Sequence, residues 1–420
     1  MIHLIAVVIF VFGFIAISLE HKLKVNKSAI ALVLGSILWF IVVLTTKVDI
    51  GNAITETGAE IFEIVIFLLC AMSLVEILVH YKLFDVIRGK LFALHLKEKH
   101  QFLLVTLLTF AFSGIIDNLT TTIVMIQIAR MFFKKDNLLI AVSGIIIAAN
   151  AGGAFSPIGD VTTIMLWLAD KFSATSVIIY GFLPSFVLYT ISTLLLSKKI
   201  VDSDFDVKTK IITKLSISEK IIITVILSSF LLTIVTGIIG LPPYFGLLIG
   251  LGISWVLIDL LKKYSTNTTH LEASIDEFIK KTDIVALKFF IGILLAVAAL
   301  HQLGILEQLS GIIYGANPSI NRIIAGNIGL GLISPVLDNV PLTAMAIQII
   351  NSTNEDLWVL LALSVGTGGS LLIIGSAAGV VAMGMVKELN FETYFKIAFI
   401  PALIGFIGCI TIWGLQFFLF

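Results

Sequence analysis

Long, nearly uninterrupted apolar segments recur along the whole of this 420-residue chain. A helix needs about 20 apolar residues to cross the roughly 30 Å hydrocarbon core of a bilayer. Only 13% of the residues are charged, against about 25% in an ordinary soluble domain. The sequence therefore predicts an all-α polytopic membrane protein. The ten predicted crossings lie at residues 2–19, 29–46, 61–80, 138–168, 174–196, 220–239, 243–261, 284–303, 357–386 and 394–417.

Two further apolar segments, residues 101–130 and 322–350, each carry an Asp-Asn pair near the middle. Each half of such a segment is about 15 residues long and reaches roughly 20 Å as a helix, which is too short to cross comfortably. We interpret both segments as re-entrant hairpins. Their tips then carry Asp117-Asn118 and Asp338-Asn339.

The distribution of Lys and Arg predicts the orientation, because cytoplasmic loops hold the excess of basic residues. With the N-terminus outside and ten crossings, the inner loops collect every basic residue except Lys47, Lys171, Lys288 and Arg322. The apolar run at residues 2–19 has no basic residue ahead of it and no small-residue cleavage site, so we expect a retained first span instead of a signal peptide. Both termini are predicted to lie outside.

Several function classes are disfavoured by composition. Lys and Arg together number 27, as do Asp and Glu. The chain therefore has no excess of positive charge that would attract nucleic acid. Cys70 and Cys409 lie within apolar runs and form no redox or metal-binding spacing. We expect no cofactor and no enzymatic activity, and the bilayer is the expected environment.

An internal repeat relates the two halves of the chain. The pattern Gly152-Gly153 followed by Gly159 recurs 216 positions later as Gly368-Gly369 followed by Gly375. Each half then contains three helices, a hairpin, a glycine-broken helix and a last helix, which makes five crossings. Because five is odd, the second copy is inverted, as in many secondary transporters. The predicted units are residues 1–197, a cytoplasmic linker at 198–219, and residues 220–420.

Acidic and hydroxyl side chains gather near the predicted breaks. Asp160 follows the glycine-rich break and precedes Thr162 and Thr163, an oxygen-rich set that suits a small hard cation. Charged groups at membrane depth are costly and usually functional. The structural alternatives are that Asp117 and Asp338 form turns and that Asp160 caps a half-helix.

We predict a cation and proton site built mainly on the first half, because the second half has largely lost these oxygens. Carboxylates that share a dry site repel one another, so such a site exchanges protons for a cation. The predicted site residues are Asp117, Asn118, Asn150, Asp160, Thr162, Thr163, Asp338 and Asn339, with Na⁺ at Asp117, Asp160, Thr162 and Thr163. Supporting residues are Ser334, Ser370, Ser376, Gly153, Gly369, Glu63 and Lys288.

Four motifs resemble those of the NhaD-type sodium/proton antiporters of the ion transporter superfamily. They begin at Ser113, Asn150, Ser334 and Gly366 and contain the two Asp-Asn pairs and the sequence Gly159-Asp160. The resemblance covers nearly the whole chain. It implies exchange of Na⁺, and often Li⁺, for H⁺ in a bacterial cytoplasmic membrane, and a homodimer with elevator-like motion. The family's functional carboxylates and polar partners match the eight site residues given above.

Two other functions remain as alternatives at this point. The first is a sodium-coupled carboxylate or arsenite/oxyanion carrier on the same scaffold, although anion sites favour Arg, Lys or helix N-termini and the motifs contain no Arg. The second is an intramembrane aspartyl protease, suggested by Gly159-Asp160 and Pro401. That protease requires a Tyr-Asp sequence, and no tyrosine here precedes an Asp.

Overall fold

The computed structural model describes residues 2–18, 20–46, 49–201, 214–264, 267–315 and 318–419. Every regular element within these residues is helical, and eight helices are long and apolar enough to cross a membrane. The prediction of an all-α polytopic membrane protein is therefore confirmed. Of the predicted linker at 198–219, residues 202–213 lie outside the described part of the chain.

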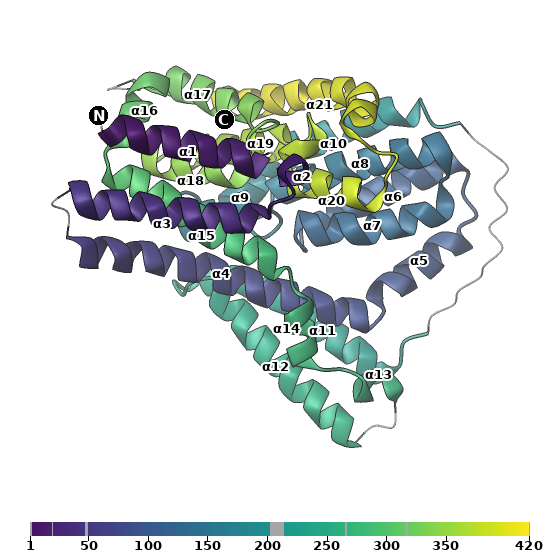
Figure 1. The fold of residues 1–420 in the computed structure, drawn as a ribbon. Coiled ribbons are helices and arrows are strands. Elements are labelled where there is room, and N and C mark those ends of the chain that lie inside the picture. The colour runs from purple at the N-terminus through teal and green to yellow at the C-terminus, as the bar shows by residue number, and fades with distance from the viewer. Residues whose placement is uncertain are drawn as a thin grey trace.

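The helices follow one another along both halves of the chain (Figure 1). In the first half they are α1 (Ile2–Ser18), α2 (Glu20–Leu23), α3 (Lys27–Thr45), α4 (Ile50–His80), α5 (Leu83–Ala93), α6 (Glu98–Ser113), α7 (Asn118–Phe132), α8 (Lys135–Ala154), α9 (Val161–Leu168) and α10 (Ala174–Ser197). In the second half they are α11 (Ile217–Ile238), α12 (Tyr244–Tyr264), α13 (Thr268–Leu271), α14 (Ile275–Lys281), α15 (Ile284–Gln302), α16 (Ile305–Ile313), α17 (Ile320–Ile333), α18 (Asn339–Ile349), α19 (Glu355–Gly368), η1 (Ile373–Gly375), α20 (Ala377–Met385) and α21 (Phe391–Leu419).

The eight long apolar helices correspond to eight of the ten predicted crossings. The other two predicted crossings are α1, an apolar helix of 17 residues, and the broken segment that begins with α19, which has 14 residues. Both termini lie toward the left of Figure 1. This agrees with an even number of crossings, whereas the side of the membrane on which the termini lie stays a prediction.

Helix α4 begins eleven residues before the start predicted from the apolar run at residues 61–80. Asp49 caps its first turn by accepting a hydrogen bond from the Asn52 backbone N–H at 3.3 Å. The polar residues that follow continue the helix, because an N-cap satisfies the free amides of a first turn whatever the hydropathy of that turn. The prediction of this start from hydropathy alone was wrong.

Both predicted hairpins consist of two short helices joined at an Asp-Asn tip. Helices α6 and α7 meet around residues 114–117, and α17 and α18 meet around residues 334–338. Asp117 and Asp338 are the N-caps of α7 and α18. Figure 1 draws the first pair on its right and the second pair on its left.

The two glycine-broken segments pack against the hairpins through matching contacts. Ser113 Oγ donates to the Ala149 carbonyl at 2.5 Å, and Ser334 Oγ donates to the Val365 carbonyl at 2.8 Å. A Cβ added to Gly152 would collide with the Phe110 carbonyl. These contacts recur between corresponding positions of the two halves, and they support the predicted repeat.

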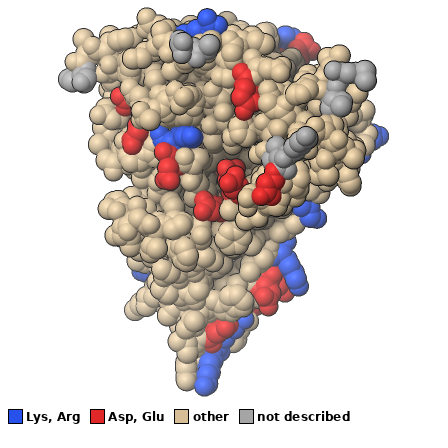
Figure 2. All heavy atoms as spheres, turned by 90° about the vertical axis from the view of Figure 1, so that its left-hand side faces the viewer, with Lys and Arg blue, Asp and Glu red and all other residues tan. Residues whose placement is uncertain are grey.

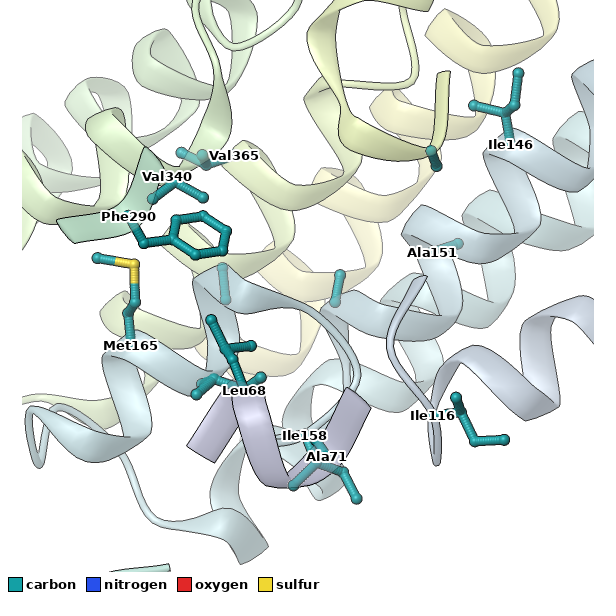
Figure 3. Close-up of a cluster of buried hydrophobic side chains, with 14 of the residues drawn as sticks. Leu68, Ala71, Ile116, Ile146, Ala151, Ile158, Met165, Phe290, Val340 and Val365 are labelled. Carbon is teal, nitrogen blue, oxygen red and sulfur yellow. The ribbon is translucent and has the colours of Figure 1, made fainter. Parts of the chain in front are cut away.

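A buried apolar cluster surrounds the hairpin tips and the broken helices (Figure 3). Leu68 on α4, Ile116 at the first tip and Phe290 on α15 are each less than 10% exposed. Helices of the two halves interlock around this core, because α3 packs along α15 and α10 packs along α21. The breaks therefore lie inside the protein, where irregular backbone is tolerated at membrane depth.

A buried histidine joins α4 to the start of α11 below this core. His270 on α13 is fully buried, with Nδ1 3.0 Å from the Tyr81 hydroxyl and Nε2 2.7 Å from Ser218 Oγ. Both ring nitrogens are thus engaged by hydroxyl groups, which accept from or donate to a neutral imidazole. Burial lowers the pKa of His270 below its usual value, against the opposing effect of Glu219.

This lowered pKa predicts loss of stability in acid. The contribution of His270 to the free energy of unfolding is complete above the pKa of a histidine in the unfolded chain, about 6.5. It is lost as the pH falls from there through the lower pKa of His270 in the folded protein. The melting temperature of the purified protein in detergent should therefore fall between about pH 7 and pH 5. We expect His270→Gln to flatten this dependence and His100→Gln, a change of an exposed histidine, to leave it unchanged. Equal slopes in the wild type and His270→Gln would contradict the assignment.

Candidate functional site

Asp160 lies at the centre of a buried polar network between the two halves. Asp160 directly precedes α9 and is only 2% exposed. Its Oδ1 accepts from Asn118 Nδ2 at 3.1 Å, and its Oδ2 accepts from Thr162 Oγ1 at 2.8 Å. Thr163 Oγ1 donates to the Asp160 carbonyl at 2.8 Å. The start of α9 thus brings one carboxylate and two hydroxyls together.

Asn150 extends this network into the second half of the chain. Its Oδ1 accepts from Asn118 Nδ2 at 3.3 Å. Its Nδ2 donates to Ser370 Oγ at 2.9 Å and to Ser376 Oγ at 3.0 Å. The two serines belong to the second glycine-broken segment, so an asparagine of α8 joins the two broken segments.

The second hairpin tip also reaches Asp160. Asn339 Nδ2 donates to Asp160 Oδ2 at 3.3 Å. A Cβ added to Gly366 on α19 would lie 3.3 Å from Asp160 Oδ2 and 3.5 Å from Thr162 Oγ1. Gly366 occupies the position that corresponds to Asn150, and its missing side chain leaves room for this carboxylate.

Asp117 and Asp338 lie at the edge of the network and bind to their own helices. Both carboxylate oxygens of Asp117 accept from Thr120, from its backbone N–H at 2.8 Å and from its hydroxyl at 2.7 Å. Asp338 accepts from the Val340 backbone N–H at 3.1 Å, and its Oδ2 lies 3.9 Å from Lys27 Nζ. The structural alternative considered for these two residues was a turn, and each of them caps the helix that follows its turn.

The predicted supporting residues near the breaks act through backbone packing. Ser334 anchors the second tip to α19 through the Val365 carbonyl. A Cβ on Gly153 would lie 2.7 Å from the Gly159 carbonyl, and a Cβ on Gly369 would lie 2.5 Å from the Gly375 carbonyl. These glycines let each broken segment fold back on itself beside the polar network.

Glu63 and Lys288 take no part in the hydrogen-bonded network around Asp160. Glu63 lines a cavity of about 360 Å³ with Glu60, Asp170 and Lys171, at the far end of α9 from Asp160. The face on the left of Figure 1 carries acidic side chains around a hollow (Figure 2). Lys288 is exposed on α15. Neither residue makes one of the hydrogen bonds of the network described above.

The network combines a single buried carboxylate with neutral amide and hydroxyl groups. The side-chain hydrogen bonds to Asp160 come from amides and a hydroxyl. Among the described residues, no group of three or more His, Cys, Asp or Glu side chains could hold a metal ion. A buried carboxylate with neutral neighbours is costly, so uptake of a proton or a small cation lowers that cost.

Three residues around the network were not among the predicted site residues. Thr120 lies three residues after Asp117, at a position whose backbone N–H an N-cap aspartate can bind. Gly366 is the first residue of one of the four motifs, but its closeness to Asp160 depends on the packing of α19 against α9. Lys27 was counted as a cytoplasmic-loop residue, and nothing in the sequence connects it with Asp338.

The fold is that of a polytopic membrane protein with a buried polar network between its two halves. Comparison with known proteins identifies the class as membrane transporters. Residues 7–359 match the family described as Citrate transporter, which covers most of the chain. The chain belongs to that family.

Within this class, the chain is similar along most of its length to sodium/proton antiporters. It is 34% identical to Sodium/proton antiporter 2 of Arabidopsis thaliana, over 92% of this chain and 93% of the relative. It is 30% identical to the Na(+)/H(+) antiporter NhaD of Alkalimonas amylolytica, over 97% of this chain and 89% of the relative. The protein is a member of the NhaD-type sodium/proton antiporter family, and the resemblance found in its motifs is confirmed.

Proposed function

We propose that this protein is a secondary transporter that exchanges Na⁺, and also Li⁺, for H⁺, with Asp160 as the group that alternates between proton and cation. The observation that carries the proposal is the burial of Asp160 among neutral oxygen-bearing partners. The names of the antiporter relatives support Na⁺ and H⁺ as exchanged ions.

The oxygens around Asp160 suit a small cation. A cation at this carboxylate would find the Thr162 hydroxyl and the Asn118 amide within the same network, and hard oxygen ligands favour such ions. When the proton occupies Asp160, these partners instead hold a neutral acid. Binding of either species excludes the other, which is the requirement for coupled exchange. The capped Asp117 and Asp338 and the cavity near Glu63 would add negative potential along the pathway.

The remaining features of the proposal concern assembly and placement. The matching contacts of Ser113 and Ser334 support two inverted repeats, 1–197 and 220–420, joined by the linker 198–219. We further propose a homodimer in a bacterial cytoplasmic membrane with both termini outside, in accord with the distribution of basic residues. The transported ions are the only ligands proposed, and the protein has no enzymatic role in this account.

The alternative is a carboxylate or oxyanion carrier, and the family description Citrate transporter is the observation in its favour. Anion carriers present helix N-termini to the substrate. In this protein the N-termini of α7 and α18 are each capped by a built-in carboxylate, and Asp160 precedes α9. These aspartates occupy the positions that an anionic substrate would need, so cation exchange is the better-supported function.

Flux measurements in proteoliposomes distinguish these two functions. Purified protein with an internal pH indicator should move protons when NaCl or LiCl is added, and it should not do so with choline chloride. Sodium citrate should give the same response as NaCl at equal Na⁺. Uptake of radiolabelled citrate or arsenite without Na⁺-driven proton movement would establish the alternative instead.

Thr162→Ala is expected to weaken the apparent affinity for Na⁺ and to leave the maximal rate nearly unchanged. The change removes the hydroxyl that binds Asp160 Oδ2 at 2.8 Å. One neutral ligand contributes about 0.5–1.4 kcal/mol to the binding free energy. Its loss therefore raises the half-saturating Na⁺ concentration about two- to tenfold. Thr411→Ala, which removes an exposed hydroxyl bound to its own helix, is the control. An unchanged half-saturation in Thr162→Ala would remove this hydroxyl from the site.

A further inference from the structure

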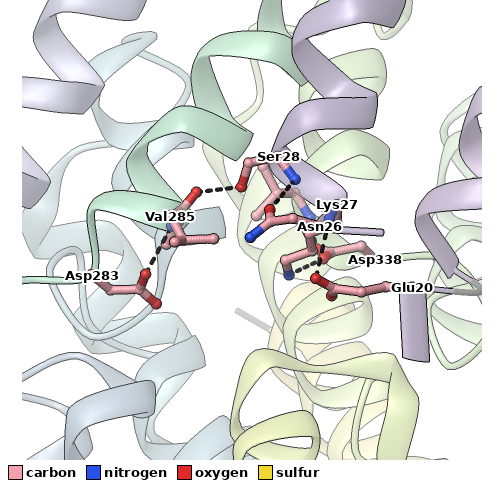
Figure 4. Close-up of polar contacts among 9 residues, drawn as sticks. Glu20, Asn26, Lys27, Ser28, Asp283, Val285 and Asp338 are labelled. Atoms are coloured by element: carbon pink, nitrogen blue, oxygen red, sulfur yellow. Dashed lines mark hydrogen bonds and ion pairs between the residues drawn. The ribbon is translucent and has the colours of Figure 1, made fainter. Parts of the chain in front are cut away.

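A lysine from the N-terminal region meets the second hairpin tip (Figure 4). Lys27 is the first residue of α3, and its Nζ lies 3.9 Å from Asp338 Oδ2. Both side chains are about one-quarter exposed, at 24% and 25%. This ion pair joins α3 to the tip that carries Asn339, although the two residues lie in different halves of the chain.

The start of α3 is held in place by several contacts that fix the position of Lys27. The Asn26 side chain caps the helix by accepting from the Ser28 N–H at 2.8 Å. Ser28 Oγ donates to the Val285 carbonyl on α15 at 2.6 Å, and the Lys27 N–H donates to Glu20 Oε1 at 3.1 Å. The backbone from which the lysine side chain extends is therefore tied to α2 and α15.

The ammonium of Lys27 is also placed by an aromatic ring. Its Nζ lies 4.6 Å from the ring centroid of Phe289, which is 1% exposed on α15. Such cation–π contacts favour one position of a flexible side chain. The N-terminus of α3 adds positive potential at the same place. The Lys27 ammonium is thus held in position opposite the carboxylate of Asp338.

The two residues of the second tip bind in different directions. Asp338 pairs with Lys27, whereas the neighbouring Asn339 donates to Asp160 Oδ2 at 3.3 Å. A long hydrogen bond of this kind depends on where the tip lies, since a shift of a few tenths of an ångström breaks it. Fixing Asp338 therefore also fixes the amide of Asn339 against the exchanging carboxylate.

We propose that Lys27 is a positioning residue for ion exchange, which acts through Asp338 to hold Asn339 against Asp160. This inference rests on the proposed function, because it assigns Asp160 as the cation and proton carrier. Lys27 does not contact the transported ion. Its loss frees the tip and leaves the Asp338 carboxylate without its cationic partner.

Flux measurements on lysine variants in proteoliposomes test this proposal. Lys27→Met should raise the half-saturating Na⁺ concentration about three- to tenfold, with the maximal rate within about twofold of the wild type. Lys27→Arg keeps the charge and should restore the affinity to within about twofold. Lys24→Met, at an exposed lysine three residues earlier, should match the wild type. The proposal is overturned if Lys27→Met keeps the wild-type affinity, or if Lys27→Arg is as impaired as Lys27→Met.

A thermal-stability cycle in detergent tests the ion pair without relying on transport. Lys27→Met and Asp338→Asn should each lower the melting temperature, and the double variant should melt no lower than the less stable single variant. Additive losses would show that the two residues are not coupled and would overturn the proposal. Coupled losses in a protein that moves no protons with Na⁺ would instead refute the proposed function and leave the ion pair intact.

Discussion

Asp160→Asn is expected to reduce Na⁺-driven and Li⁺-driven proton movement to the level of empty liposomes. Asparagine keeps the size of the side chain but cannot give up a proton or supply a negative charge to a cation. Its amide group also presents a donor to Asn118 or Asn339, both of which donate to the carboxylate in the wild type. Exchange therefore loses both of the states between which this residue must alternate.

The control for this variant is an aspartate outside the network. Asp136→Asn changes an exposed residue in the first turn of α8 and should exchange ions as the wild type does. Size-exclusion profiles in detergent should show that Asp160→Asn and Asp136→Asn are equally monodisperse, which separates loss of exchange from loss of folding. Near-normal exchange in a well-folded Asp160→Asn protein would remove Asp160 from the mechanism.

Gly368→Ala is expected to prevent the protein from folding into a stable transporter. A Cβ at this position would collide with the carbonyl of Gly331 on α17 and would also meet its carbonyl carbon at 2.9 Å. The obstacle is backbone, so no change of rotamer relieves it, and the two helices must separate. Overpacking costs about 1–3 kcal/mol or more in a close-packed core, and the same crossing positions the tip that reaches Asp160.

A second glycine on the same helix pair provides the comparison. Gly329 lies on α17 two residues before Gly331, and a Cβ there would meet nothing within 4 Å. Gly329→Ala should be neutral or slightly stabilising, because alanine favours a helix by about 1 kcal/mol. The measurement is the yield and melting temperature of each variant in detergent. A fully stable Gly368→Ala protein would show that α17 and α19 do not cross this closely.

The order of helices and breaks could be predicted from the sequence because hydropathy and glycine position report directly on membrane crossing and helix interruption. The Asp-Asn pairs predicted both hairpin tips, and Gly152 and Gly368 predicted the helix breaks beside them. The start of α4 at Ile50 could not be predicted in this way, because the capping residue Asp49 lies ahead of a polar turn. Local capping there outweighed the hydropathy signal.

The composition of the polar network could also be predicted, but its connections could not. Asp160, Thr162 and Thr163 are close in sequence, so their proximity follows from the start of α9. The contacts of Asn150 with Ser370 and of Asn339 with Asp160 depend on the packing of one half on the other. The pairing of Lys27 with Asp338 depends on the same packing, and a single sequence carries no sign of it.

Proton release on cation binding tests the central claim most directly, because it needs neither a membrane gradient nor a complete transport cycle. Purified protein in weakly buffered detergent solution would be titrated with NaCl at slightly alkaline pH, with choline chloride as the control salt and a pH indicator as the readout. The account predicts saturable proton release with NaCl and LiCl, little or none with choline chloride, and none in Asp160→Asn. Absence of release in the wild type, or equal release in Asp160→Asn, would contradict exchange at this carboxylate.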